Sequence, residues 1–173
     1  MAFFYCDYKK PETQVAATIF GSLVKQLALQ DERCLRQLEV FYEAHNTKGQ
    51  HPKEVTAIGL CNLLRSMAVN YRYTMILIDG LDEIETSRIK TVELLCSLSS
   101  IGLKTLYASR DEVDIRNSLA DYAKVSIAAQ SKDLRLYVAA EIRIRITGNQ
   151  LVIRDEELKE HIMRTLITGA EGM

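Results

Sequence analysis

The segment Thr74–Asp79 constrains the fold of this chain more than any other part of its sequence. Its four consecutive apolar residues, Met75–Ile78, are followed directly by an acid. A strand with one face in water alternates between apolar and polar residues, whereas a strand covered on both faces is a continuous apolar run. The segment is therefore predicted to be a central strand of a parallel sheet with helices on both faces.

Three other short segments are predicted to be strands, and helical segments separate them. The predicted strands are Phe3–Cys6, Lys104–Ala108 and Val125–Ala128. Helices are predicted after Gln14, after the capping residue Asp31, from about Glu54, after the capping residue Ser87, and around Val113–Leu119. Helical connections of about 15 residues or more favour parallel pairing of the strands that they join. The predicted fold class is therefore α/β, with a three-layer parallel sheet.

The last part of the chain is predicted to be helical, with caps at Ser131 or Asp133 and near Asp155. One stretch, Ile142–Ile146, leaves two interpretations open. It alternates with a period of two, which is typical of a strand, but it also continues the four-residue spacing of the apolar residues before it. We favour the helix. Residues 1–129 are expected to form the α/β core and residues 130–173 a helical extension.

The composition excludes several classes of protein. Hydrophobic residues make up 47% of the 173 residues, which is enough for a packed core. The net charge of −1 gives no reason to expect nucleic acid or an anionic membrane as a partner. No apolar run approaches the ~20 residues that span a bilayer. The four cysteines are too far apart for a zinc site and lie in apolar patterns, so we expect a cytoplasmic chain with buried free thiols.

Three carboxylates follow the predicted central strand at close spacing. Asp79 ends the strand, Gly80 permits a tight turn, and Asp82 and Glu83 come next. Because parallel strands bring their carboxyl ends to one edge, Arg110, which follows a neighbouring strand, is expected there too. Converging carboxylates repel one another unless a cation or hydrogen-bond donors balance them, and magnesium prefers such oxygens. This pattern favours magnesium chemistry; the alternative is that Asp79 only caps the next helix.

Two motifs resemble those of a known family. "MILIDGLDE", residues 75–83, resembles the Walker B segment of NACHT-type signal-transduction ATPases, and "TLYASRDE", residues 105–112, resembles the sensor strand of the same family. "FFYCDY" and "QSKDLRLYVAAEI" resemble flanking segments of its fungal, nephrocystin-like branch. The resemblance implies a sheet of the P-loop NTPase type, in a domain that precedes ankyrin or similar repeats in innate-immunity-like receptors.

The same resemblance implies a role for each polar residue at the predicted edge. Asp79 would contact the magnesium shell, Asp82 or Glu83 would polarise the hydrolytic water, and Arg110 would sense the γ-phosphate of ATP or GTP. The residue types suit these roles, since carboxylates bind magnesium and water and a guanidinium is a planar donor to phosphate. The alternative for Arg110 is an ordinary ion pair with Asp111, Asp82 or Glu83.

The phosphate-binding loop of the family, G-x-x-x-x-G-K-[ST], does not occur in the sequence, because none of the eight glycines is followed by Lys. In the family this loop and the first strand lie upstream of the segment that resembles Phe3–Cys6. We therefore expect a partial domain without its first strand that binds no nucleotide or cofactor alone. Magnesium with ATP or GTP would serve the full-length parent. The expected partners are the missing loop segment and the winged-helix and repeat regions after Met173.

A second hypothesis belongs to a different class. The chain would then be a non-catalytic α/β interaction module, acting in self-association as a homo-oligomer or in a signalling scaffold. Exposed helices such as Asp155–Thr168 would be its working surface. A hydrolase with a serine nucleophile has little support, because the sequence lacks G-x-S-x-G.

Overall fold

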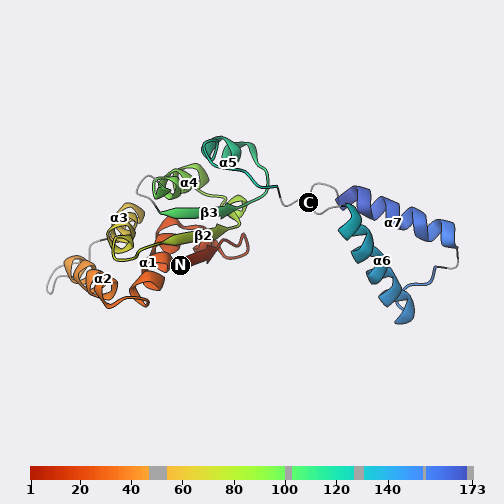
Figure 1. The fold of residues 1–173 in the computed structure, drawn as a ribbon, viewed down its shortest axis with the longest axis horizontal. Helices are drawn as coiled ribbons and strands as arrows, with labels where there is room; N and C mark the ends of the chain where they lie inside the picture. The colour runs from red at the N-terminus through yellow and green to blue at the C-terminus, as the bar shows by residue number, and fades with distance from the viewer. Residues whose placement is uncertain (47–53, 100–102, 127–130, 154, 171–173) are drawn as a thin grey trace. The chain divides into compact units, whose positions relative to one another are not determined.

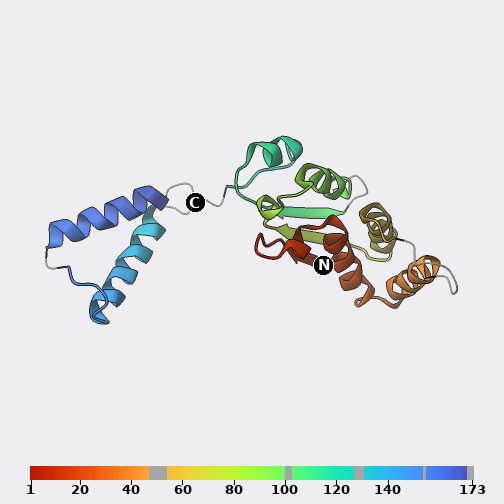
Figure 2. The ribbon, with the colours of Figure 1, turned by 180° about the vertical axis from the view of Figure 1, so that it is seen from behind.

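The computed structural model describes residues 1–46, 54–99, 103–126, 131–153 and 155–170. The chain divides into two compact units, Met1–Tyr122 and Ala123–Met173. Figures 1 and 2 show the first unit from opposite sides, with its three strands side by side and its helices next to them.

The sheet consists of β1 (Ala2–Tyr5), β2 (Met75–Asp79) and β3 (Lys104–Ala108) in the order β1-β2-β3, and both pairs are parallel. The three predicted strands therefore form, β2 is the central one of those described, and the α/β class is confirmed. The fourth predicted strand, Val125–Ala128, does not form in its two described residues. Val125 and Ser126 lie in no strand, and Ile127 and Ala128 lie outside the described residues.

The α-helices of the first unit lie close to their predicted positions. They are α1 (Ala16–Ala28), α2 (Glu32–His45), α3 (Ala57–Ala68), α4 (Arg88–Cys96) and α5 (Val113–Ser118). Two short 3-10 helices, η1 (Pro11–Gln14) and η2 (Leu81–Glu83), were not predicted. Asp31 caps α2 as predicted, because its side chain accepts a hydrogen bond from the backbone N–H of Arg33. Ser87 precedes α4, but its side chain does not cap the helix: its φ of 59° is left-handed, and only its carbonyl oxygen accepts from Thr91.

The hydrophobic core lies against one face of the sheet. Alternate strand residues such as Ile76 and Ile78 are fully buried and belong to one cluster with α1, α3 and α4. The opposite face carries exposed apolar side chains: Phe3 (43% exposed), Tyr5 (58%), Met75 (39%) and Leu106 (50%). Coverage of both faces, and with it the three-layer sheet, is therefore wrong for the part of the chain that the structure describes. The prediction failed because an uninterrupted apolar run does not determine whether other elements cover both faces of a strand.

The two edges of the sheet differ. At β1, the side-chain amide of Gln26 accepts from the N–H of Phe3 (3.1 Å) and donates to the carbonyl oxygen of Phe3 (2.7 Å). Gln30 donates to the carbonyl oxygen of Met1 at 3.0 Å. This glutamine clamp, Gln26 and Gln30 of α1, makes the bonds that a further strand would make. At the other edge, β3 has a neighbour on one side only among the strands described.

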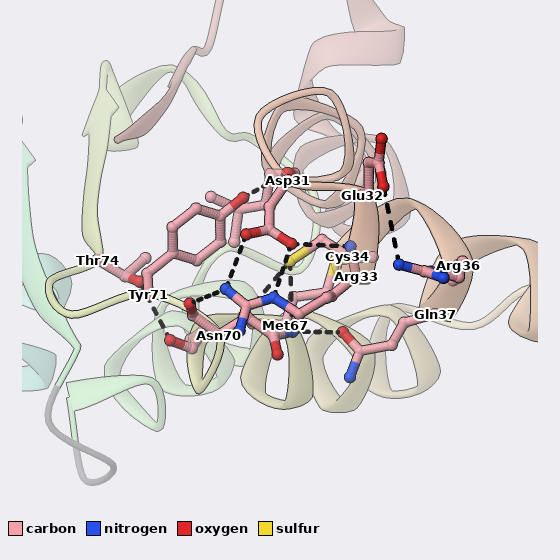
Figure 3. A network of polar contacts seen from close by, with 12 residues as sticks. Asp31, Glu32, Arg33, Cys34, Arg36, Gln37, Met67, Asn70, Tyr71 and Thr74 are labelled. Atoms are coloured by element: carbon pink, nitrogen blue, oxygen red, sulfur yellow. Dashed lines mark hydrogen bonds and ion pairs between the residues drawn. The ribbon is translucent and has the colours of Figure 1, made fainter.

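A polar network joins the start of α2 to the end of α3 (Figure 3). The guanidinium of Arg33 donates to the carboxylate of Asp31 at 2.9 Å and to the carbonyl oxygen of Asn70 at 2.8 Å. The Asn70 amide donates to Gln37 at 3.0 Å, and the Tyr71 hydroxyl donates to the carbonyl oxygen of Leu27 at 2.6 Å. These contacts fix the turn between α1 and α2 against α3.

The network predicts a dependence of stability on pH. Hydrogen bonds from the side chain and then the backbone of Arg33 lower the pKa of Asp31 from 3.8 to about 2. A folded-state pKa below the unfolded one stabilises the fold above the unfolded value, and this contribution is lost as the pH falls from about 4 to about 2. Asp31→Asn keeps a good N-cap residue but removes the charge, so its unfolding free energy should fall less steeply over this range. Denaturant unfolding at several pH values measures the difference.

The control is Glu32→Gln, which removes the neighbouring acid of the same first turn of α2, whose ion pair with Arg36 at 3.8 Å is exposed. Equal pH profiles for Asp31→Asn and the unmodified chain would contradict the assignment of this effect to Asp31.

The second unit contains α6 (Ser131–Thr147) and α7 (Glu156–Ala170). Ile142–Ile146 lies within α6, so the helical interpretation is confirmed, and Asp155 caps α7 by accepting from the N–H of Glu157 at 2.9 Å. Ile142 and Met163 are buried in this unit. An ion pair of 2.8 Å joins Arg135 of α6 to Glu160 of α7.

Candidate functional site

The carboxyl ends of the three strands are joined by backbone hydrogen bonds that continue the sheet. The N–H of Cys6, just after β1, donates to the carbonyl oxygen of Asp79 at 2.9 Å. The N–H of Gly80, just after β2, donates to the carbonyl oxygen of Ala108 at 3.0 Å. The residues that follow β1, β2 and β3 therefore start from one hydrogen-bonded edge, as the sequence predicted.

Gly80 makes the turn that brings the acids together. Its backbone is left-handed (φ 75°, ψ 41°), which glycine adopts at little cost. A Cβ atom at this position would lie 3.0 Å from the carbonyl oxygen of Cys6. The turn continues into η2, where the side chain of Leu81 is fully buried and anchors the segment in the core. Asp82 and Glu83 are thus presented by a fixed loop, the acidic turn (residues 79–84).

Two of the three acids already hold partners within the protein. One carboxylate oxygen of Glu83 accepts from the backbone N–H of Tyr8 at 2.8 Å, which ties the acidic turn to the segment after β1. Asp82 accepts from the backbone N–H of Arg110 at 3.0 Å, and its other oxygen lies 3.5 Å from Nε of Arg110. The ion pair between Arg110 and Asp82, one of the alternatives left open by the sequence, is therefore present.

The exposure of the pair is unequal, since 84% of the Arg110 side chain is exposed against 10% of the Asp82 side chain. The guanidinium of Arg110 thus has most of its surface in water. Asp79 differs from the other two acids: its side chain is exposed at the end of β2, on the face of the sheet that carries Tyr5.

The buried thiol of Cys6 lies near all three carboxylates. Burial, followed by the negative charges of Asp79, Glu83 and Asp82, raises the pKa of Cys6 to about 12. The thiol is therefore protonated at neutral pH and is not a nucleophile there. The structure thus brings Asp79, Asp82 and Glu83 to one place, as predicted, although it gives two of them structural bonds.

Sequence reasoning missed Arg88, which lies at the start of α4 and is 19% exposed. Its Nε donates to the carbonyl oxygen of Ile84 at 2.6 Å, and Nη2 donates to the carbonyl oxygen of Asp82 at 3.0 Å. Its Nη1 forms ion pairs with Glu112 and, at 3.3 Å, with Asp114. A signal for it was present, because a basic residue at a helix N-terminus opposes the helix dipole and needs acceptors from elsewhere.

The three acids do not form a ready-made metal site. Within the described ranges, no group of three or more His, Cys, Asp or Glu side chains is arranged to hold a metal ion. The Asp79 side chain is exposed at the strand end, whereas Asp82 and Glu83 each already accept a backbone hydrogen bond through one carboxylate oxygen. Among the described helices, none is long and apolar enough to cross a membrane.

The sequence matches a known protein family. The family model described as "Nephrocystin 3, N-terminal" matches residues 1–110, a segment that contains β1, β2, β3, the acidic turn and Arg110. No curated protein and no solved structure matches the chain. Because the match covers more than half of the 173 residues, the chain belongs to the nephrocystin 3 N-terminal family.

Proposed function

We propose that this chain is part of a NACHT-type nucleotide-binding domain, the part that carries the Walker B carboxylates and the sensor arginine. We propose also that it does not bind or hydrolyse nucleotide by itself. One observation carries the proposal: the acidic turn and Arg110, which follow two neighbouring parallel strands, lie together and in contact. The family match, which spans this whole region, supports it. The domain would belong to a larger receptor of the kind that carries ankyrin or similar repeats.

Each residue has a role that suits its surroundings. Asp79 is the candidate for the magnesium shell, because its carboxylate is exposed at the strand end. Arg110 is the candidate for contact with the γ-phosphate, because most of its side chain faces solvent. Asp82 or Glu83 would orient the attacking water. Bound magnesium would supply charge stabilisation of the phosphate oxygens.

The chain lacks the donors that a triphosphate needs opposite these acids. Phosphates are held by the backbone N–H groups and the Lys of a glycine-rich loop, and no glycine of this sequence is followed by Lys. Without such donors, a carboxylate cluster repels the phosphates. The nucleotide, ATP or GTP, would therefore bind only when a phosphate-binding loop from outside these 173 residues completes the site.

Calorimetry tests the proposal directly. Titration of the chain with MgATP or MgGTP is expected to show no binding at micromolar concentrations. Binding with a micromolar Kd that requires magnesium and is lost in Asp79→Asn would overturn the claim that the chain is inactive alone. The same titration with an exposed control, Glu32→Gln, separates an effect at the acidic turn from a general change of charge.

The exposed face of the sheet favours a second candidate function. The side chains of Phe3, Tyr5, Met75 and Leu106 form an apolar surface that suits a protein interaction module better than a nucleotide site. The genomic sequence upstream of Met1 discriminates the two proposals. An in-frame G-x-x-x-x-G-K-[ST] there supports the nucleotide-binding domain, and its absence beside a genuine start codon supports the interaction module.

A further inference from the structure

We propose that Arg88 is a positioning residue that locks the acidic turn and the loop after β3 into one unit. Its functional meaning rests on the proposed function, because the two segments carry the candidate magnesium and phosphate contacts. The geometric claim, that Arg88 fixes Arg110 relative to Asp82, is independent of any nucleotide.

The guanidinium of Arg88 contacts both segments at once. On one side it donates to the carbonyl oxygens of Asp82 and Ile84, which belong to the acidic turn. On the other side it pairs with the carboxylates of Glu112 and Asp114, which follow β3. Only a planar group with several fixed donors can reach four acceptors on two segments, and a Lys ammonium cannot reproduce this arrangement.

Burial makes these contacts necessary rather than incidental. The Arg88 side chain is only 19% exposed, and it stands at the N-terminus of α4, where a cation opposes the helix dipole. A cation largely removed from water is stable only when its donors are paired. If one of the two segments moved away, Arg88 would lose half of its partners, so the segments are held together.

The two arginines of the site therefore have different tasks. The Arg88 side chain is mostly buried, whereas that of Arg110 is exposed, with its Nε 3.5 Å from a carboxylate oxygen of Asp82. An anion that draws the Arg110 side chain away from Asp82 would leave its backbone in place. The response of this site to a phosphate would then be a side-chain movement of Arg110 on a fixed loop.

Residue-resolved amide hydrogen exchange on the whole chain tests the proposal. The reporter is the N–H of Arg110, which donates to Asp82, and the reference is the N–H of Lys104, which donates to Thr74 at the far end of the β2–β3 pair. In Arg88→Gln and Arg88→Lys, protection of the Arg110 amide should fall roughly tenfold or more, while the Lys104 amide changes less than about twofold. Glu112→Gln should give a loss of the same kind.

The control is Arg116→Gln, which removes an exposed ion pair of 3.0 Å between Arg116 of α5 and Asp111 and should leave the Arg110 amide protected. If Arg88→Gln does not fold, Arg88→Lys and Glu112→Gln carry the test. Unchanged protection at Arg110, or an equal loss at Arg110 and Lys104, would overturn the proposal. Nucleotide binding in calorimetry would refute the proposed function while leaving the exchange result intact, so the two failures are distinguishable.

Discussion

Gly80→Ala is expected to lower the free energy of unfolding by roughly 1–3 kcal/mol, because a side chain in the left-handed region is strained. The φ of Gly80 is 75°, and the added Cβ would meet the carbonyl oxygen of Cys6 at 3.0 Å. That oxygen belongs to the backbone, so relief requires the segment after β1 to shift. Denaturant unfolding followed by circular dichroism measures the change.

Gly21→Ala is the matched control, because the same substitution should have the opposite sign there. Gly21 lies inside α1, and its added Cβ would only touch Leu60 at 3.8 Å. Alanine in a helix interior is favoured over glycine by about 0.5–1 kcal/mol, so this variant should be more stable than the unmodified chain. Equal effects of the two variants would contradict the conformational explanation.

Ile78→Ala is expected to cost about 2–5 kcal/mol of unfolding free energy, which is the cost of a cavity at a well-packed site. Ile78 is fully buried on the face of β2 that meets the helices. Because Asp79 is the next residue, this variant should also loosen the acidic turn. Thermal and denaturant unfolding give the loss of stability.

Leu106→Ala is the control for Ile78→Ala, since Leu106 lies on the opposite face of the sheet and is 50% exposed. Its truncation should cost less than about 1 kcal/mol. A loss as large as that of Ile78→Ala would mean that this face of the sheet is covered, for example by a second copy of the chain. The concentration dependence of the melting temperature would then reveal the association.

Much of the fold follows from local sequence pattern. The apolar runs gave the three strands, since a short run bounded by polar residues has few other stable arrangements. Asp31 and Asp155 were recognisable as caps because their carboxylates satisfy helix N–H groups that otherwise lack partners. The meeting of Asp79, Asp82, Glu83 and Arg110 was also predictable, because parallel strands bring their carboxyl ends to one edge.

The remainder depends on tertiary contacts that local pattern does not encode. The apolar run of β2 could not reveal that one face of the sheet is exposed, because exposure depends on what packs there. Serine is a common N-cap residue, but the backbone of Ser87 is left-handed and its side chain makes no capping hydrogen bond. Glu83 accepts from Tyr8, which lies 75 residues away in the sequence, and Arg88 pairs with Glu112, which lies 24 residues away. Local pattern could not indicate contacts between residues so far apart.

The glutamine clamp on β1 limits how copies of this chain can associate. A filament of edge-paired sheets requires each molecule to offer two open edges, so that every addition leaves another edge free. The Gln26 amide occupies the N–H and carbonyl oxygen of Phe3, which leaves β3 as the open edge among the described strands. Pairing through β3 alone consumes the open edge of both copies, so assembly by this route ends at a dimer.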